Sequence, residues 1–182
     1  MHELLAFKVD EHISLQLPMR HHAEEVAMVV VQNLDRLKEW MPWAISEYSV
    51  ESATEFIQRN LRGLAEDGSF GLLIRYNSKL AGTIGFHNLD RVNSSAHIGY
   101  WIAKDFEGRG IITVCCRLLI DYLFSQMDLN RVQINCNVEN TRSRAVPERL
   151  GFTLEGIQRQ AEYIHGRYGD WAIYAMLRED WK

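Results

Sequence analysis

The 182-residue sequence lacks the features of a membrane protein, a disulfide-rich secreted domain or a nucleic-acid-binding protein. Its uninterrupted apolar runs, such as Val26 to Val31, are far shorter than the ~20 residues that span a bilayer. The three cysteines are an odd number and show no C-x-x-C spacing, which argues against a disulfide framework and a zinc site. Acidic residues outnumber basic ones 24 to 20, the opposite of the basic excess typical of nucleic-acid binding.

The chain also has few features that would divide it. It contains only three prolines, no repeat and no Pro/Gly/Ser-rich linker, and its start shows no basic-then-apolar signal peptide. At roughly 100–200 residues per domain, we expect residues 1–182 to form one domain. We further expect a reducing, cytoplasmic location, no membrane contact and no direct nucleic-acid partner.

Hydrophobic periodicity predicts an α/β chain. Helices are expected over 21–37, 50–65, 111–124 and 143–150. Strands are expected over 13–17, 70–76, 80–88, 96–102, 131–138, 153–163 and 171–177. The predicted order is therefore β-α-α-β-β-β-α-β-α-β-β, with an antiparallel meander in the middle.

The most informative segment is a Gly-x-Gly turn, Gly108 to Gly110, between a predicted strand and a predicted helix. The first N–H groups of such a helix have no internal partner, and together with the helix dipole they attract an anion. Glycines there let a phosphate approach the backbone closely, and Arg109 and Thr113 can add donors. The spacing fits neither a P-loop nor a dinucleotide motif, and taken alone it is also compatible with a simple tight turn.

Four segments in order resemble the GNAT acyltransferases, and within them the RimJ/RimL-type N-acetyltransferases. They are Ile98–Ile102, Phe106–Ile111, Asn140-x-x-Ser143, and Leu150-Gly151-Phe152 followed by Glu155-Gly156. The resemblance extends from Ile13 to about Trp181. It implies a GNAT fold, an α/β (α+β) architecture with a mixed, mostly antiparallel sheet of about seven strands. The sheet is expected to be splayed at its middle and flanked by about four helices.

Two residues depart from the family's [Gln/Arg]-x-x-Gly-x-[Gly/Ala] turn. Glu107 stands where Gln or Arg is usual, and a carboxylate cannot donate to a phosphate, so we assign it no binding role. Ile112 is bulky where a small residue is usual, and we expect its side chain to point into the core. Because the turn acts through backbone N–H groups, acyl-CoA binding is compatible with both departures.

The resemblance implies direct transfer of an acetyl group from acetyl-CoA, the co-substrate, to an amine, without a metal. The backbone of residues 109–113 would hold the pyrophosphate, and an N–H on strand Ile98–Trp101 would hold the thioester carbonyl. Arg142, Arg144 and Arg149 either meet the CoA 3′-phosphate or form a solvated helix face. The implied cofactor-binding residues are Ile98, Tyr100, Trp101, Ile102, Arg109, Gly110, Ile111, Ile112, Thr113, Asn140, Ser143 and Arg149.

Ser143 is implied as the general acid that hydrogen-bonds the CoA sulfur, although its position also suits a helix N-cap. Glu162 is the first choice for the base that takes the amine proton through a water. His97 is the second choice and His87 the third, since histidine titrates near neutrality. Each of the three is also compatible with an ordinary strand residue.

The loop Trp40–Trp43 is expected to shape the acceptor site, and Trp40, Trp43, Tyr163 and Trp171 form either an aromatic wall or core. Cys115 and Cys116 are interpreted as core residues. The preferred acceptor is the N-terminal α-amine of a protein, as in ribosomal-protein acetyltransferases. Alternatives are a small amine, such as a polyamine or an antibiotic, and a module that binds acyl-CoA without turnover. The resemblance also makes a homodimer plausible.

Overall fold

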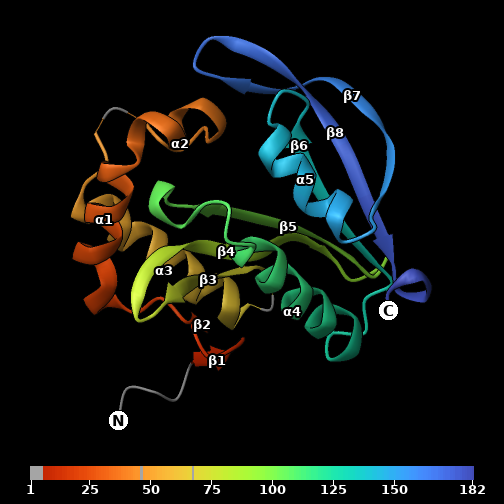
Figure 1. Cartoon of the computed structure of the whole chain (residues 1–182), viewed down its shortest axis with the longest axis horizontal. Coiled ribbons are helices and arrows are strands. Elements are labelled where there is room, and N and C mark those ends of the chain that lie inside the picture. Colours follow the sequence, from red (N-terminus) through yellow and green to blue (C-terminus); the bar gives the residue numbers. More distant parts are fainter. Residues whose placement is uncertain (1–5, 46, 67) are drawn as a thin grey trace.

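The computed structural model describes residues 6–45, 47–66 and 68–182. These ranges contain eight strands and five α-helices (Figure 1). The first half comprises β1 (Ala6–Lys8), β2 (Ile13–Gln16), α1 (Ala23–Gln32), α2 (Leu34–Trp40), α3 (Val50–Ala65), β3 (Phe70–Tyr76), β4 (Lys79–Asp90) and β5 (Ser95–Ile102). The second half comprises α4 (Ile111–Ser125), β6 (Arg131–Asn137), α5 (Thr141–Arg149), β7 (Thr153–Ile164) and β8 (Arg167–Leu177). Within the described ranges, no helix is both long and apolar enough to cross a membrane.

The strands form one sheet in the order β1-β2-β3-β4-β5-β6-β8-β7. Every neighbouring pair is antiparallel except β5 and β6, which are parallel. The predicted mixed, mostly antiparallel sheet is therefore confirmed. The strand beyond the seven expected is β1, whose residues Ala6 to Lys8 pair with β2. A three-residue strand is too short to show a two-residue period in sequence.

The helix expected over residues 21–37 is two helices separated at Asn33. The Asn33 side chain donates from Nδ2 to the Val29 carbonyl (2.8 Å) and accepts the Lys104 N–H at Oδ1 (2.8 Å). An asparagine side chain that bonds nearby backbone groups competes with the helix, which explains the break. The bond to Lys104 also holds the start of α2 against the segment that precedes α4.

Two hydrophobic clusters lie on opposite faces of the sheet. One joins α4 and α5 to the strands and includes Ile111, Ile120 and Phe152. The other joins α1, α2 and α3 to Leu73 and Trp101. Ile112 belongs to the α4 cluster and is buried, so the prediction that its side chain points into the core is confirmed. Figure 1 shows α4 across β3–β5 and α5 beside β6.

The sheet opens between β5 and β6. Their parallel register runs only from Ser95 opposite Arg131 to His97 opposite Gln133. Beyond that point β6 continues to pair with β8, and β5 continues to pair with β4, but the two strands no longer pair with each other. The expected splay is thus present, and it leaves the last residues of β5 facing an opening rather than a neighbouring strand.

Candidate active site

A cavity of about 660 Å³ lies where β5 and β6 separate. Its walls come from β4 and β5 on one side and from β6 and α5 on the other, while the loop after α2 and part of α3 close one end. Of the residues predicted to bind the cofactor or act as acid or base, eight line it: His87, His97, Ile98, Tyr100, Trp101, Asn140, Ser143 and Glu162. The splay therefore brings residues from β5, α5 and β7 around one space.

Asn140, not Ser143, is the N-cap of α5. Its Oδ1 accepts the Ser143 N–H at 3.0 Å, so the alternative interpretation of Ser143 as the helix N-cap is wrong. Both residue types cap helices well, and sequence alone does not show which one precedes the first turn. Because Asn140 supplies the cap, the Ser143 hydroxyl does not bond the helix N-terminus and faces the cavity.

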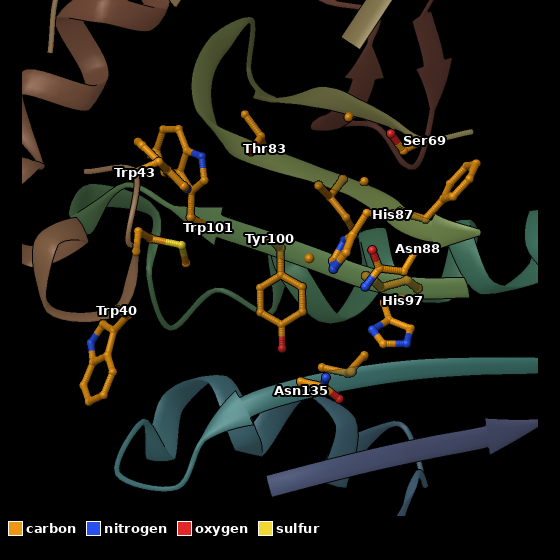
Figure 2. A pocket seen from close by; sticks show the side chains of 18 of the residues that line it. Trp40, Trp43, Ser69, Thr83, His87, Asn88, His97, Tyr100, Trp101 and Asn135 are labelled. Carbon is orange, nitrogen blue, oxygen red and sulfur yellow. The ribbon is translucent and has the colours of Figure 1, made fainter. Parts of the chain in front are cut away.

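The Ser143 hydroxyl meets two other proton-bearing side chains. Its Oγ lies 3.3 Å from the Tyr100 hydroxyl and 3.2 Å from Cys136 Sγ. The Tyr100 hydroxyl in turn donates to the Ser143 carbonyl oxygen at 3.0 Å. In Figure 2, the Tyr100 ring extends from β5 across the opening toward β6, where Asn135 is seen. No local sequence pattern indicated this contact of the Tyr100 hydroxyl and Cys136 with Ser143, because the three residues come from three separate elements.

Glu162 reaches the cavity from β7 at an irregularity of that strand. The β7–β8 register shifts between Gln158 and Glu162, and Gln160 has a φ of 51° while its N–H donates to Asp170 Oδ1 at 2.8 Å. A bulge of this kind re-aims the following side chains. Asn137 Nδ2, at the end of β6, donates to Glu162 Oε1 and fixes the carboxylate.

His87 and His97 face each other on β4 and β5, with ring centroids 5.6 Å apart (Figure 2). Burial lowers the pKa of His97, and the neighbouring His87 and Arg131 lower it further. The His87 side chain is exposed. The surrounding protein nevertheless excludes part of its hydration, and this desolvation lowers its pKa. Both rings are therefore neutral at pH 7, which leaves each able to accept a proton.

The glycine turn leads directly into α4 at the edge of the site. Gly108 and Gly110 have φ values of 72° and 73°, and Gly110 is the N-cap of α4. The first helical N–H with a partner is that of Val114, which donates to the Gly110 carbonyl at 3.1 Å, so the N–H groups of 111–113 point out of the helix end. A Cβ on either glycine would meet no atom within 4 Å, so the turn is open to a ligand.

The side chains around this turn are already engaged. The Arg109 guanidinium lies 5.4 Å from the Tyr76 ring centroid and donates to the Asp105 carbonyl. The side chain is therefore engaged elsewhere, and Arg109 presents its backbone rather than its guanidinium to the turn. Arg149 donates to Thr113 Oγ1 at 2.8 Å, which joins α5 to the first turn of α4. A phosphate group fits this arrangement, because free backbone donors, a helix N-terminus and one guanidinium converge there.

The Glu107 carboxylate forms ion pairs with arginine side chains instead of facing the glycine turn. Its carboxylate pairs with Arg36 of α2 and, at 2.9 Å, with Arg142 of α5. Arg144 is also engaged internally, with the Tyr174 hydroxyl and the Val138 carbonyl. Of the basic cluster on α5, Arg149 is thus the residue that contacts the glycine-turn helix.

Three of the four aromatic residues proposed for the acceptor wall line the cavity: Trp40, Trp43 and Trp171. Figure 2 shows Trp43 beside Trp101, and their ring centroids are 6.3 Å apart. Tyr163 does not line the cavity, so this part of the prediction is wrong. Neighbouring side chains on a strand point to opposite faces, and Tyr163 follows Glu162; it is exposed and packs on Tyr168.

Cys115 and Cys116 are fully buried in α4, which confirms that they are core residues. Burial raises the pKa of Cys115 to about 12, so the reactive thiolate does not form near neutrality. Ile102 is partly buried against the α4 cluster and does not line the cavity. Across the described parts of the chain, no group of three or more His, Cys, Asp or Glu side chains is placed to hold a metal ion.

Comparison with known proteins identifies the family. The model of the acetyltransferase (GNAT) domain matches residues 12–153. YdaF of Bacillus subtilis (strain 168), provisionally named a ribosomal N-acetyltransferase, is 44% identical over 96% of each chain. The ribosomal-protein-serine acetyltransferase of Escherichia coli (strain K12) is 30% identical over 93% of this chain and 95% of its own.

Solved structures agree. One is RimL, the ribosomal L7/L12 α-N-protein acetyltransferase, in complex with coenzyme A that forms a disulfide with a cysteine of the enzyme. It superposes on this chain with a TM-score of 0.90 at 30% identity, covering 94% of this chain and 97% of RimL. The microcin C7 self-immunity acetyltransferase MccE, in complex with acetyl-CoA and AMP, has a TM-score of 0.91 at 32% identity, covering 97% and 98%. The chain therefore belongs to the GNAT acetyltransferase family, within it to the RimL/RimJ-like N-acetyltransferases that take the acetyl group from acetyl-CoA and transfer it to an amine.

Proposed function

We propose that this protein acetylates the N-terminal α-amine of a protein, as its ribosomal-protein acetyltransferase relatives are named for doing. The observation that carries the proposal is that Ser143 and Glu162 line one cavity at the opening between β5 and β6. A donor for the leaving sulfur and an acceptor for the amine proton are thereby available in a single space. The cavity volume of about 660 Å³ lies within the usual range of ligand-binding clefts.

In this proposal the cofactor is held by two parts of the fold. The backbone N–H groups of 110–113, with Arg149 beside Thr113, bind the pyrophosphate or 3′-phosphate. The unpaired edge of β5 at residues 98–101 binds the pantetheine and the thioester carbonyl, because its backbone groups have no β6 partner there. Asn140 contributes by fixing the first turn of α5 next to this arm. Holding both substrates in one orientation supplies much of the rate enhancement.

The side chains then manage two protons. Glu162, oriented by Asn137, accepts the amine proton through a water as nitrogen attacks the thioester carbon. Ser143, which lines the cavity, donates a hydrogen bond from Oγ to the departing sulfur. His97 and His87, both neutral at pH 7, are the alternative bases. Acetyl-CoA supplies the activated acyl group.

A second candidate function is acetylation of a small amine that carries a planar ring. Trp40 and Trp43 line the cavity, and MccE, a structural neighbour, was solved with AMP as well as acetyl-CoA. Aromatic walls of this kind stack on nucleobases and other flat rings. The two functions differ in the acceptor and share the cofactor site.

An acceptor panel tests both. We expect acetyl-CoA-dependent thiol release with peptides that begin with free serine or alanine, and no release with the same peptides blocked at the N-terminus but carrying an internal lysine. Mass spectrometry of the product must place the acetyl group on the α-amine. Turnover only with amines that carry a planar ring, such as aminoacyl nucleotides, would replace the first function by the second. Turnover only with polyamines or aminoglycosides would contradict both. Binding of acetyl-CoA without turnover on any acceptor would identify a non-catalytic module.

We further propose that residues 1–182 act as one domain in the cytoplasm, where ribosomal proteins are made and where three free cysteines stay reduced. We also propose that the chain forms a homodimer, as the family resemblance makes plausible. Light scattering at micromolar concentration measures the mass directly, and a value near the 21.2 kDa of one chain would contradict pairing.

A further inference from the structure

Tyr100 makes the direct side-chain link between β5 and the first turn of α5. Its ring projects from the unpaired part of β5 (Figure 2), and its hydroxyl donates to the Ser143 carbonyl at 3.0 Å. The same hydroxyl accepts a hydrogen bond from Ser143 Oγ at 3.3 Å. One phenol oxygen thus contacts both the backbone and the side chain of the residue proposed to face the CoA sulfur.

The position of Ser143 relative to β5 needs such a link, because the sheet does not provide one. β5 and β6 stop pairing after His97 and Gln133, so no backbone ladder spans the opening beside Tyr100. The cap bond of Asn140 ties Ser143 to its own helix and does not reach β5. The distance between the β5 backbone, which would hold the thioester, and the Ser143 hydroxyl is therefore set in part by Tyr100.

The cluster contains donors and no base. Burial, followed by the nearby Cys136 and Cys116 thiols, raises the pKa of Tyr100 well above its usual value. Burial also raises the pKa of Cys136, whose Sγ lies 3.2 Å from Ser143 Oγ. Both groups keep their protons at neutral pH, so Tyr100 remains a donor to the Ser143 carbonyl.

We propose that Tyr100 is a positioning residue: its hydroxyl holds the first turn of α5 so that Ser143 Oγ lies within reach of the sulfur of acetyl-CoA. The inference rests on the proposed function, in which Ser143 serves the leaving group. The amine nitrogen bonds to the acyl carbon and the C–S bond breaks. The C–S electron pair moves to sulfur, and Ser143 turns its hydrogen from Tyr100 to that sulfur. Cys136 Sγ–H then donates to Ser143 Oγ. The proton lost by the amine balances the proton that the thiolate finally gains, and Tyr100 keeps its own.

A double-mutant cycle of Tyr100→Phe and Ser143→Ala tests the inference. Tyr100→Phe keeps the ring and removes only the hydroxyl; we expect kcat to fall roughly tenfold, the effect of one ordinary hydrogen bond, with an unchanged KM for acetyl-CoA. In the Ser143→Ala background, Tyr100→Phe should cause no further loss, because its effect passes through the Ser143 hydroxyl. Coupling of this kind separates positioning from general stabilisation.

Tyr174→Phe is the matched control. Tyr174 is a buried tyrosine on β8 whose hydroxyl also bridges to α5, by donating to Glu148 at 2.6 Å and accepting from Arg144 at 3.0 Å. It does not line the cavity. We expect Tyr174→Phe to lower Tm at least as much as Tyr100→Phe does, while kcat stays at the wild-type value.

The outcomes distinguish the inference from the function beneath it. Equal losses from Tyr100→Phe in both backgrounds, or an unchanged kcat in Tyr100→Phe, overturn the positioning role and leave Ser143 in place. An unchanged kcat in Ser143→Ala overturns the proposed role of Ser143 and the inference with it. A parallel loss of kcat in Tyr174→Phe shows that any loosening of α5 has the same effect, and this also overturns the specific role of Tyr100.

Discussion

Replacing Gly110 by alanine tests whether the turn before α4 binds phosphate through its backbone. Gly110 has a φ of 73°, which an L-residue adopts at a cost of about 1–2 kcal/mol. An added Cβ would meet no protein atom within 4 Å, so backbone strain is the whole cost in the free protein. In a chain of this size that corresponds to a fall in Tm of roughly 2–8 °C.

Binding should suffer more than stability. The Cβ would stand in the open space that a phosphate needs in order to reach the N–H groups of 111–113. Loss of one charge-assisted hydrogen bond, worth about 1.5–3 kcal/mol, weakens binding roughly 10- to 100-fold. Calorimetric titration of Gly110→Ala with CoA measures this directly, and the KM for acetyl-CoA should rise in parallel while the KM for the acceptor does not.

Gly151→Ala supplies the control. Gly151 follows α5, has a φ of 80° and also has no atom within 4 Å of an added Cβ, so it carries comparable backbone strain away from the cofactor turn. We expect a similar fall in Tm and wild-type affinity for CoA. Wild-type CoA affinity in Gly110→Ala would refute phosphate binding at this turn, and an equal loss in Gly151→Ala would attribute the effect to strain alone.

Three further predictions concern the base, the acceptor wall and pH stability. Glu162→Gln keeps an oxygen for Asn137 Nδ2 but cannot take a proton; kcat should fall roughly 100-fold and the acidic limb of the pH–rate profile should vanish, whereas an unaltered limb would identify His97 as the base. Trp43→Ala should raise the KM for the acceptor and leave the KM for acetyl-CoA unchanged, since Trp43 belongs to the loop that closes the cavity; the reverse pattern in initial-rate kinetics would contradict this. His22 is buried, accepts the Met19 N–H at Nδ1, and has a pKa lowered mainly by burial to about 4. Because its folded pKa lies below the unfolded value of 6.5, stability is full above pH 6.5 and falls by up to about 3 kcal/mol toward pH 4. Chemical denaturation of His22→Gln should show a weaker pH dependence over this interval, and an identical one would refute the assignment.

Local patterns were sufficient for most of the secondary structure. The helix expected over 50–65 is α3 with the same bounds, and strand 70–76 is β3. These elements are long and their periods are unbroken, so burial of one face determines their conformation. The helix expected over 21–37 was wrong at Asn33, because the side chain that breaks it is held by Lys104, distant in sequence.

The conformation of the glycine turn was predictable because the backbone alone determines it. A Gly-x-Gly turn before a helix leaves free N–H groups in any fold, and the structure has positive φ at both glycines. Side-chain contacts were not predictable in the same way. Glu107 stands where the family pattern has Gln or Arg. Only the fold shows that its carboxylate pairs with Arg36 and Arg142.

The sequence by itself determined that the chain is neither membrane-spanning by a long apolar helix nor strongly basic, and its ordered motifs indicated an acetyltransferase with a backbone cofactor turn. The tertiary structure alone decided which side chains meet. Separation of β5 from β6 lets Tyr100, Cys136 and Ser143 converge, and the bulge in β7 places Glu162 beside Asn137 while Tyr163 faces away. The physical reason is range: propensity and periodicity act over a few residues, whereas these contacts join residues up to 43 positions apart through the packing of the sheet.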